Sequence, residues 1–435
     1  MNKTKELLVT AFALFALFFG AGNLLLPPLL GYNAAGDWAL VVLGFAITAV
    51  IIPIIGIYAH AKLQGTMFDF GKKVSPLFSR IFCIVVYAIS IIIPSPRTAS
   101  ATHEIVIQPL FNTNALTTST VYFGLVLLFV LNRSKIMSFI GKYLTPIIVA
   151  MLLVVIGLSV FGGDSIVHQS TLTTPLVSGI LEGYQTFDAI GAVVVGAVII
   201  ISLNMRGHTD YEAKKQLIWR AGLISGAGLL IMYAGLIAVG ASYGTEIEGF
   251  NQMGGDMRRS TLLRGIITQA IGSNGNLVLS LLLGLACFTT AVGIVAGAAD
   301  YFKGVFKDSK KAYIITAVLS CVIGVLVGQM NFHDIIVVAT PILAFIYPIV
   351  IVLIFLNALP NRFANAQVFR AVVLVTFLFS LPDVLSGIGM GESVAGLNEY
   401  IPLSEFSMGW VLPALVAFMV ANVLFKQAVR PNLPN

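Results

Sequence analysis

Apolar segments long enough to cross a lipid bilayer recur along the chain from residue 7 to residue 425. A transmembrane helix needs about 20 consecutive, predominantly apolar residues. Of the 435 residues, 58% are hydrophobic and only 10% are charged, whereas soluble domains are about 25% charged. We therefore expect an all-α integral membrane protein with twelve transmembrane helices. The predicted spans are 7–30, 38–60, 81–97, 120–132, 138–161, 176–201, 219–242, 276–299, 313–330, 335–356, 369–388 and 408–425, and the third is expected to run further toward His103.

The basic residues between the spans predict the orientation. If the twelve spans alternate in direction, 21 of the 25 Lys and Arg residues fall on one side of the membrane. Because Lys-rich and Arg-rich loops face the cytoplasm, both termini are expected there. This distribution also explains the net charge of +6 without nucleic acid as a partner. The residues assigned to the other side are Arg97, Arg258, Arg259 and Arg264.

Motifs of other protein classes are missing from the sequence. It contains no H-E-x-x-H, G-x-S-x-G or GKS/T pattern, and its five histidines lack the spacing of metal ligands, so we expect neither an enzyme nor a cofactor. An ion channel would need a continuous polar path through the membrane. In the predicted spans, polar residues interrupt the apolar sequence at two places instead. No sequence feature defines an oligomeric state.

The first predicted span is interrupted by the stretch FFGAGNLLLPP, Phe18–Pro28. Glycine loosens a helix and proline removes a backbone donor, and broken backbone at membrane depth is tolerated only where it lines a cavity or is buried in protein. A break at Gly20 and Gly22 would leave N–H groups that suit a carboxylate and C=O groups that suit a cation. Asn23 adds a side-chain oxygen beside both. A proline kink with glycines used for packing is the alternative.

The sixth predicted span carries four polar residues within an apolar segment, namely Glu182, Gln185, Thr186 and Asp188. A charged side chain at the centre of a bilayer costs about 2.5–3.5 kcal/mol on insertion scales and usually faces a polar cavity. Glu182 lies near the outer end of the span, where a solvated position explains it equally well. Asp188 lies deeper, and we predict a functional role for it.

The eighth predicted span contains two adjacent hydroxyl side chains, Thr289 and Thr290, among small and apolar residues. Hydroxyl oxygens and freed backbone carbonyls are hard ligands that suit Na⁺. The alternative is that each hydroxyl donates to the carbonyl four residues earlier in its own helix.

The interruptions lie in the first and sixth spans, which indicates two units of five helices each. Because five is an odd number, the second unit is inverted in the membrane, and paired interrupted helices in an inverted repeat point to a transporter site near the midplane. We therefore predict one integral domain, 1–435, made of a first five-helix repeat (7–161), an inverted second repeat (176–356) and two additional helices (369–425).

The stretch FFGAGNLLLPPLLGYNAAG, residues 18–36, resembles the opening signature of bacterial branched-chain amino acid:cation symporters. The predicted layout of twelve spans and the chain length also fit that family, so the resemblance covers nearly the whole chain. It implies a leucine-transporter-like fold with five-plus-five inverted repeats and discontinuous first and sixth helices. It also implies a multi-pass protein of the bacterial cytoplasmic membrane.

The resemblance further implies how the site residues act. Asn23 would contact a sodium ion near the substrate carboxylate, Tyr87 would touch that carboxylate, and Phe187 would close over the substrate. Together with the interruptions, this gives a predicted substrate site of Gly20, Ala21, Gly22, Asn23, Tyr87, Gln185, Thr186, Phe187 and Asp188. A further sodium would be held by the backbone carbonyls of Ala16 and Phe19 together with Ala286, Thr289 and Thr290.

Asp188 departs from the generic pattern of sodium-coupled carriers, so either Na⁺ or a proton is open as the coupling ion. A buried carboxylate must face a cation or an ammonium group, or else become neutral. We expect a sodium-coupled symporter that imports leucine, isoleucine and valine by alternating access. The alternative is a proton-coupled carrier of the same fold for another small amine or a nucleobase.

Overall fold

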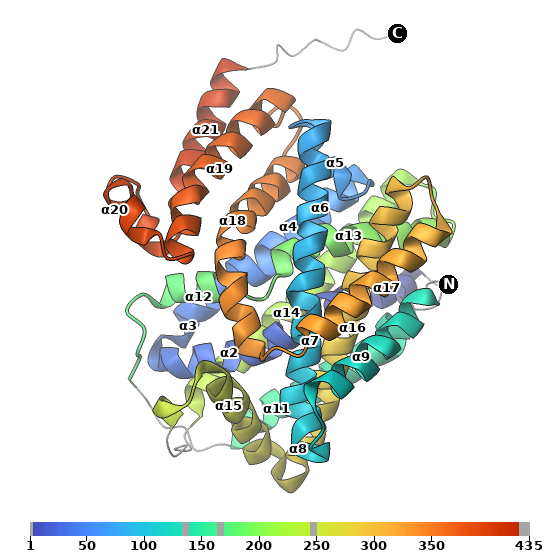
Figure 1. The fold of residues 1–435 in the computed structure, drawn as a ribbon, viewed down its shortest axis with the longest axis vertical. Coiled ribbons are helices and arrows are strands. Elements are labelled where there is room, and N and C mark those ends of the chain that lie inside the picture. Colours follow the sequence, from blue (N-terminus) through green and yellow to red (C-terminus); the bar gives the residue numbers. More distant parts are fainter. Residues whose placement is uncertain (1–2, 133–138, 163–168, 244–249, 426–435) are drawn as a thin grey trace. The chain divides into compact units, whose positions relative to one another are not determined.

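The computed structural model describes residues 3–132, 139–162, 169–243 and 250–425 (Figure 1). Within these ranges every regular element is a helix and no strand is present. The chain divides into two compact units. The first contains Met1–Thr66 and Val85–Ala339, and the second contains Met67–Ile84 and Thr340–Asn435. The residues of both predicted sites belong to the first unit.

The first predicted span consists of two helices, α1 (Lys3–Phe18) and α2 (Ala21–Ala34), separated by Phe19 and Gly20. The glycine pattern therefore marks a true interruption. The prolines further along do not end α2, which continues through both of them. The second predicted span contains α3 (Trp38–Ala46), a π-helical turn (Ile47–Ile51) and α4 (Ile52–Leu63).

The third span is longer than 81–97. It comprises α6 (Pro76–Ile92), α7 (Pro94–Ala101), a π-helical turn (Thr102–Ile107) and α8 (Gln108–Phe111), and α6 and α7 run nearly end to end in Figure 1. Its N-terminal part, before Val85, belongs to the second unit. The next two spans are α9 (Ala115–Leu131) and α11 (Thr145–Gly162), the latter preceded by a π-helical turn, Ile140–Leu144.

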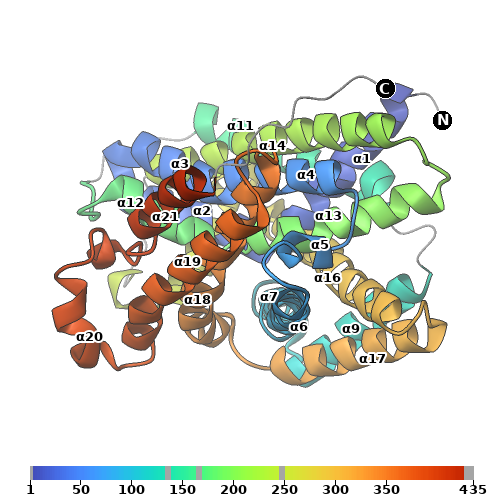
Figure 2. The same ribbon diagram turned by 90° about the horizontal axis from the view of Figure 1, so that it is seen from above.

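The sixth span is interrupted as the first one is. Helix α12 (Pro175–Tyr184) ends before Gln185, and α13 (Asp188–Met205) begins at Asp188 (Figure 2). The helices that follow in the first unit are α14 (Tyr211–Ser242), α15 (Gly255–Ile271), α16 (Gly275–Val305), α17 (Lys310–Val327) and the beginning of α18 (Phe332–Ala358). Helix α15 lies between the seventh and eighth predicted spans.

The second unit contains the short helix α5 (Phe68–Gly71), most of α18, and the helices α19 (Ala366–Gly387), α20 (Gly391–Asn398) and α21 (Val411–Leu424). Within it, α19 packs against α20 and α21. The amide of Asn357 donates to the carbonyl of Phe70, which ties α18 to α5.

Nine helical stretches of the described residues are long and apolar enough to cross a membrane, and α9 and α21 are shorter apolar helices. Each predicted span thus coincides with helical structure. An all-helical membrane fold is confirmed, whereas the number of twelve crossings and the repeat boundaries stay predictions.

Glycines allow the helices around the two interruptions to pack backbone against backbone. A Cβ atom at Gly31 of α2 would lie 1.9 Å from the carbonyl oxygen of Ile237, and one at Gly240 of α14 would lie 2.0 Å from that of Pro28. Small residues at such crossings drive helix association in membranes. The packing holds α2 against α14, which carries a residue of the site described next.

Candidate functional site

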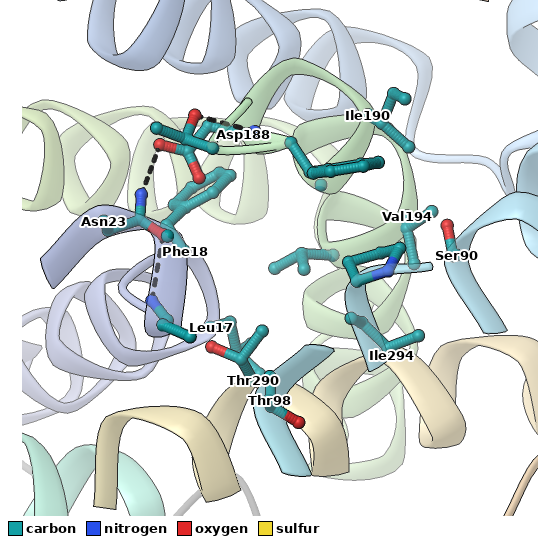
Figure 3. Close-up of a pocket in the computed structure, with 18 of the residues that line it drawn as sticks. Leu17, Phe18, Asn23, Ser90, Thr98, Asp188, Ile190, Val194, Thr290 and Ile294 are labelled. Atoms are coloured by element: carbon teal, nitrogen blue, oxygen red, sulfur yellow. Dashed lines mark hydrogen bonds between the residues drawn. The ribbon is translucent and has the colours of Figure 1, made fainter. Parts of the chain in front are cut away.

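The two interrupted helices meet through their side chains. The Asn23 amide nitrogen, at the start of α2, donates to Asp188 Oδ2 at the start of α13 over 2.8 Å (Figure 3). The amide oxygen of Asn23 accepts from the backbone N–H of Gly20 at 3.0 Å. Asn23 therefore bridges the first interruption to the second one, although 165 residues separate the two side chains.

Asp188 is the charged centre of this junction and is only 2% exposed. Tyr233 of α14 donates its hydroxyl to Asp188 Oδ2 at 3.0 Å and also accepts from the Asn23 amide. The backbone N–H of Asp188 donates to the Thr186 hydroxyl at 3.3 Å. Asp188 Oδ2 thus accepts two side-chain hydrogen bonds at the N-terminus of α13. Phe187 precedes it in a left-handed conformation, with φ of 65°.

A cavity lies beside the junction. The centre of a water molecule can occupy about 40 Å³ of it. Residues of the two interruptions and of α6, α7 and α16 form its wall. Figure 3 shows Ser90, Val194 and Ile294 together on the side away from Asn23. One part of the wall is thus polar and charged and another is apolar. The apolar residues are Leu17, Phe18, Pro94, Ile190, Val194, Val195 and Ile294.

Oxygen atoms of α1 and α16 gather near the end of α1. The Thr289 hydroxyl lies 3.0 Å from the carbonyl oxygen of Ala16 and 3.0 Å from that of Ala286. The Thr290 hydroxyl oxygen is buried and has no hydrogen-bond partner among the described residues. It faces Gly20, where a Cβ atom would lie 2.9 Å from it. The structure therefore brings together four of the predicted sodium residues, Ala16, Ala286, Thr289 and Thr290, beside the first interruption.

Arg97 occupies a place that the sequence analysis did not predict. The alternation of the spans groups it with the basic residues opposite the termini, but it gives Arg97 no role in the site; α7 and α8 extend the third span beyond it. Arg97 is 3% exposed and lines the cavity. It lies in the first turn of α7, after a kink at Ile93, whose backbone has φ of −114° and ψ of −76°. Pro94 and Pro96 lack N–H donors, which is the usual cause of such kinks.

The remaining predicted substrate residues divide between the cavity and its surroundings. Gly20, Ala21, Gly22, Asn23, Thr186, Phe187 and Asp188 line the cavity. Gln185 contributes its backbone carbonyl, which accepts from Arg97 Nη2 at 2.8 Å. Tyr87 lies outside the lining, buried, with its ring stacked on Tyr301 at 4.8 Å between centroids. Glu182, near the outer end of α12, is paired with Arg259 of α15 at 3.3 Å.

Sequence reasoning missed Tyr233 and Arg97 as site residues, and it named no residue of the apolar wall. The sequence does contain a signal for Arg97. Two prolines precede it within an apolar segment, and the first interruption is marked in a similar way by glycines and prolines. Tyr233 carries no such signal. It lies within the uninterrupted helix α14, and only the packing of α14 against α2 turns its hydroxyl toward Asp188.

A membrane fold in which two interrupted helices meet at a buried, charged cavity is the architecture of a secondary transporter. Solved structures share the fold of this chain. The chain resembles MhsT in complex with L-phenylalanine (TM-score 0.53, 16% identity, 96% of this chain and 98% of that one). It also resembles Mhp1, a nucleobase-cation-symport-1 family transporter (TM-score 0.53, 12% identity, 99% and 94%). At these identities the likeness shows the fold alone.

Residues 3–428 match the family model for branched-chain amino acid transport proteins. The chain is 32% identical over 432 residues to the branched-chain amino acid permease BraB of Bacillus subtilis, covering 97% of this chain and 95% of BraB. It is 33% identical over 441 residues to the branched-chain amino acid transport system 2 carrier protein of Pseudomonas aeruginosa, covering 98% of each. The chain therefore belongs to the branched-chain amino acid transport protein family, a family of multi-pass membrane transporters and not of enzymes.

Proposed function

We propose that this protein is a sodium-coupled symporter that imports leucine, isoleucine and valine by alternating access. The observation that carries the proposal is the junction of the two interruptions, where Asn23 contacts Asp188 beside a cavity with an apolar wall. An amino acid with a branched side chain needs a charged end and an apolar end in one enclosed site. Membership of the family supplies the substrate class.

The substrate would lie with its charged end at the junction. Its ammonium group would face Asp188, and its carboxylate would lie at the first turn of α2, where N–H groups at a helix N-terminus favour an anion. The branched side chain would contact Ile190, Val194 and Ile294. Because one methylene in an apolar pocket is worth about 1–3 kcal/mol, discrimination among leucine, isoleucine and valine should be weak.

Sodium would bind at two places beside the first interruption. One is the cluster of Ala16, Ala286, Thr289 and Thr290, completed by the Phe19 carbonyl. Its hydroxyl and carbonyl oxygens are hard ligands, and the buried Thr290 oxygen, which has no hydrogen-bond partner in the described part of the chain, is suited to be one of them. The other is near Asn23 and the substrate carboxylate. Sodium binding at either place would be coupled to movement of α1 relative to α2 about Phe19 and Gly20.

The membrane arrangement in this proposal follows the distribution of basic residues. Both termini would lie in the cytoplasm of a bacterial cell, and the repeats 7–161 and 176–356 would have opposite orientations. The two interruptions would then face each other as inverted counterparts and move relative to the rest of the bundle during transport.

Uptake by purified protein in proteoliposomes tests the proposed function. Labelled leucine should accumulate when sodium is higher outside than inside, and isoleucine and valine should compete. Accumulation driven by a pH gradient without sodium would instead establish proton coupling. Failure to bind or accumulate any branched-chain amino acid under either gradient would reject the substrate assignment.

Replacing Thr289 or Thr290 by valine should raise the sodium concentration needed for half-maximal leucine uptake. Each change preserves side-chain volume and removes one oxygen, and an interaction of this kind is worth about 1–3 kcal/mol, or about 5-fold to 160-fold in sodium affinity. The measurement is initial uptake as a function of sodium concentration at saturating leucine.

Thr376→Val is the matched control for these two variants. Thr376 is also buried, but its hydroxyl donates to the Val372 carbonyl of its own helix in the second unit. Its sodium dependence should be that of the unmodified protein. If both Thr289→Val and Thr290→Val kept the unmodified sodium dependence, the assignment of this cluster to sodium would be rejected.

A further inference from the structure

Arg97 places a second buried charge in the cavity that holds Asp188. Its side chain is 3% exposed and lines the same cavity. Buried charges in proteins are compensated, because removing an isolated charge from water is very costly. A transporter site that carries one acidic and one basic side chain matches the charges of a zwitterion.

The contacts of Arg97 fix the direction of its guanidinium group. Nη2 donates to the backbone carbonyl of Gln185 at 2.8 Å, in the second interruption. The guanidinium also lies over the Phe187 ring, with 5.1 Å between Cζ and the ring centroid, and over the Phe332 ring at 5.2 Å. A guanidinium has five N–H donors in one plane, and Nη2 supplies the donor to Gln185.

The guanidinium also lies against the beginning of α2. A Cβ atom built on Gly22 would lie 2.2 Å from Arg97 Nη2. The N-terminus of a helix carries partial positive charge, so the structure places two positive groups together on one wall of the cavity. Their juxtaposition is unfavourable by itself and becomes favourable when an anion lies beside both of them.

We propose that Arg97, together with the first turn of α2, binds the carboxylate of the transported α-amino acid. The planar guanidinium suits a carboxylate, which it can bind through two parallel hydrogen bonds. Asp188 would then receive the ammonium group, so that the two charged side chains hold the two ends of the zwitterion. This inference rests on the proposed function and adds to it the residue that recognises the carboxylate.

Leucine and leucinamide distinguish this role from a structural one. Leucinamide keeps the ammonium group and the side chain, and replaces the carboxylate by a neutral amide. Dissociation constants are measured for the purified protein in saturating sodium, at a pH where the leucinamide amine is protonated. The unmodified protein should prefer leucine at least tenfold. In Arg97→Gln, which keeps a donor for the Gln185 carbonyl, the leucine dissociation constant should rise at least tenfold while that of leucinamide hardly changes.

Two further variants complete the test. Arg370→Gln is the matched control, because Arg370 also donates to a backbone carbonyl, that of Val74 at 2.9 Å, but is exposed in the second unit. It should keep the preference for leucine. Arg97→Lys retains the charge, so it should also keep the preference, with weaker leucine binding. This variant decides the matter if Arg97→Gln does not fold, and loss of the preference in it would contradict the proposal.

Two results with Arg97→Gln would overturn the inference. An equal rise of both dissociation constants would show that Arg97 holds the two interruptions together without contacting the carboxylate. An unchanged leucine dissociation constant would show that it has no part in binding. Either result leaves the proposed function intact, since that function is rejected only if the unmodified protein binds and transports no branched-chain amino acid.

Discussion

Replacing Asp188 by asparagine is expected to abolish sodium-dependent leucine binding and uptake. The amide has the shape of the carboxyl group, and its oxygen can still accept from Asn23 and Tyr233. It carries no charge, however, for the substrate ammonium group or a cation. Removing one partner of a buried charge contact costs about 2–5 kcal/mol or more, so leucine affinity should fall at least about 30-fold. Binding of labelled leucine to purified protein, with and without sodium, measures the loss.

Two other results with Asp188→Asn would have different meanings. If the variant still binds and exchanges leucine but no longer accumulates it under a pH gradient, Asp188 carries a coupled proton. If sodium-driven accumulation is normal, Asp188 has neither role and is structural. Asp383→Asn is the matched control, because Asp383 is also a buried acidic residue within an apolar helix but belongs to the second unit. It should transport leucine like the unmodified protein.

The two interruptions could be predicted from sequence because they violate the rule that governs the rest of the chain. A membrane span normally reads as an unbroken apolar segment. Glycines at Gly20 and Gly22, and a carboxylate at Asp188, are costly there unless a cavity or a partner compensates them. The local sequence therefore indicates an unusual environment. It does not indicate that Asn23 and Asp188 contact each other, which depends on how the helices pack.

The residues that sequence reasoning missed lie in local sequences that are common in membrane proteins and do not by themselves indicate a binding site. Arg97 follows an apolar segment of normal length, and basic residues at such ends usually lie in loops. Only the continuation of α7 and α8 makes its position buried. Tyr233 resembles any aromatic residue within an apolar helix. The family resemblance assigned Tyr87 to the third helix but did not show which way its side chain points. Its ring packs on Tyr301, outside the cavity lining.

Among substitutions that leave the charge of the site unchanged, those at Gly22 are expected to weaken substrate binding most. A Cβ atom there would lie 2.2 Å from Arg97 Nη2 and 3.4 Å from the Gln185 carbonyl oxygen. Alanine would displace the guanidinium, and leucine would also fill the space between the two interruptions. Gly22→Ala should therefore weaken leucine binding, and Gly22→Leu should abolish it, while the protein stays folded and membrane-inserted. Gly284→Leu is the control, because no atom outside its own helix backbone lies within 4 Å of its Cβ position.

Gly20→Ala separates the two parts of the site, because its Cβ atom would meet the Thr290 hydroxyl at 2.9 Å rather than Arg97. It should raise the sodium concentration for half-maximal uptake. Gly22→Ala should instead raise the leucine dissociation constant measured in saturating sodium. Leucine binding by Gly22→Leu with the affinity of the unmodified protein would contradict this account, since a side chain of that size cannot coexist with the observed position of Arg97. Identical sodium and leucine responses in the two alanine variants would show that both glycines serve only the packing of the interruption.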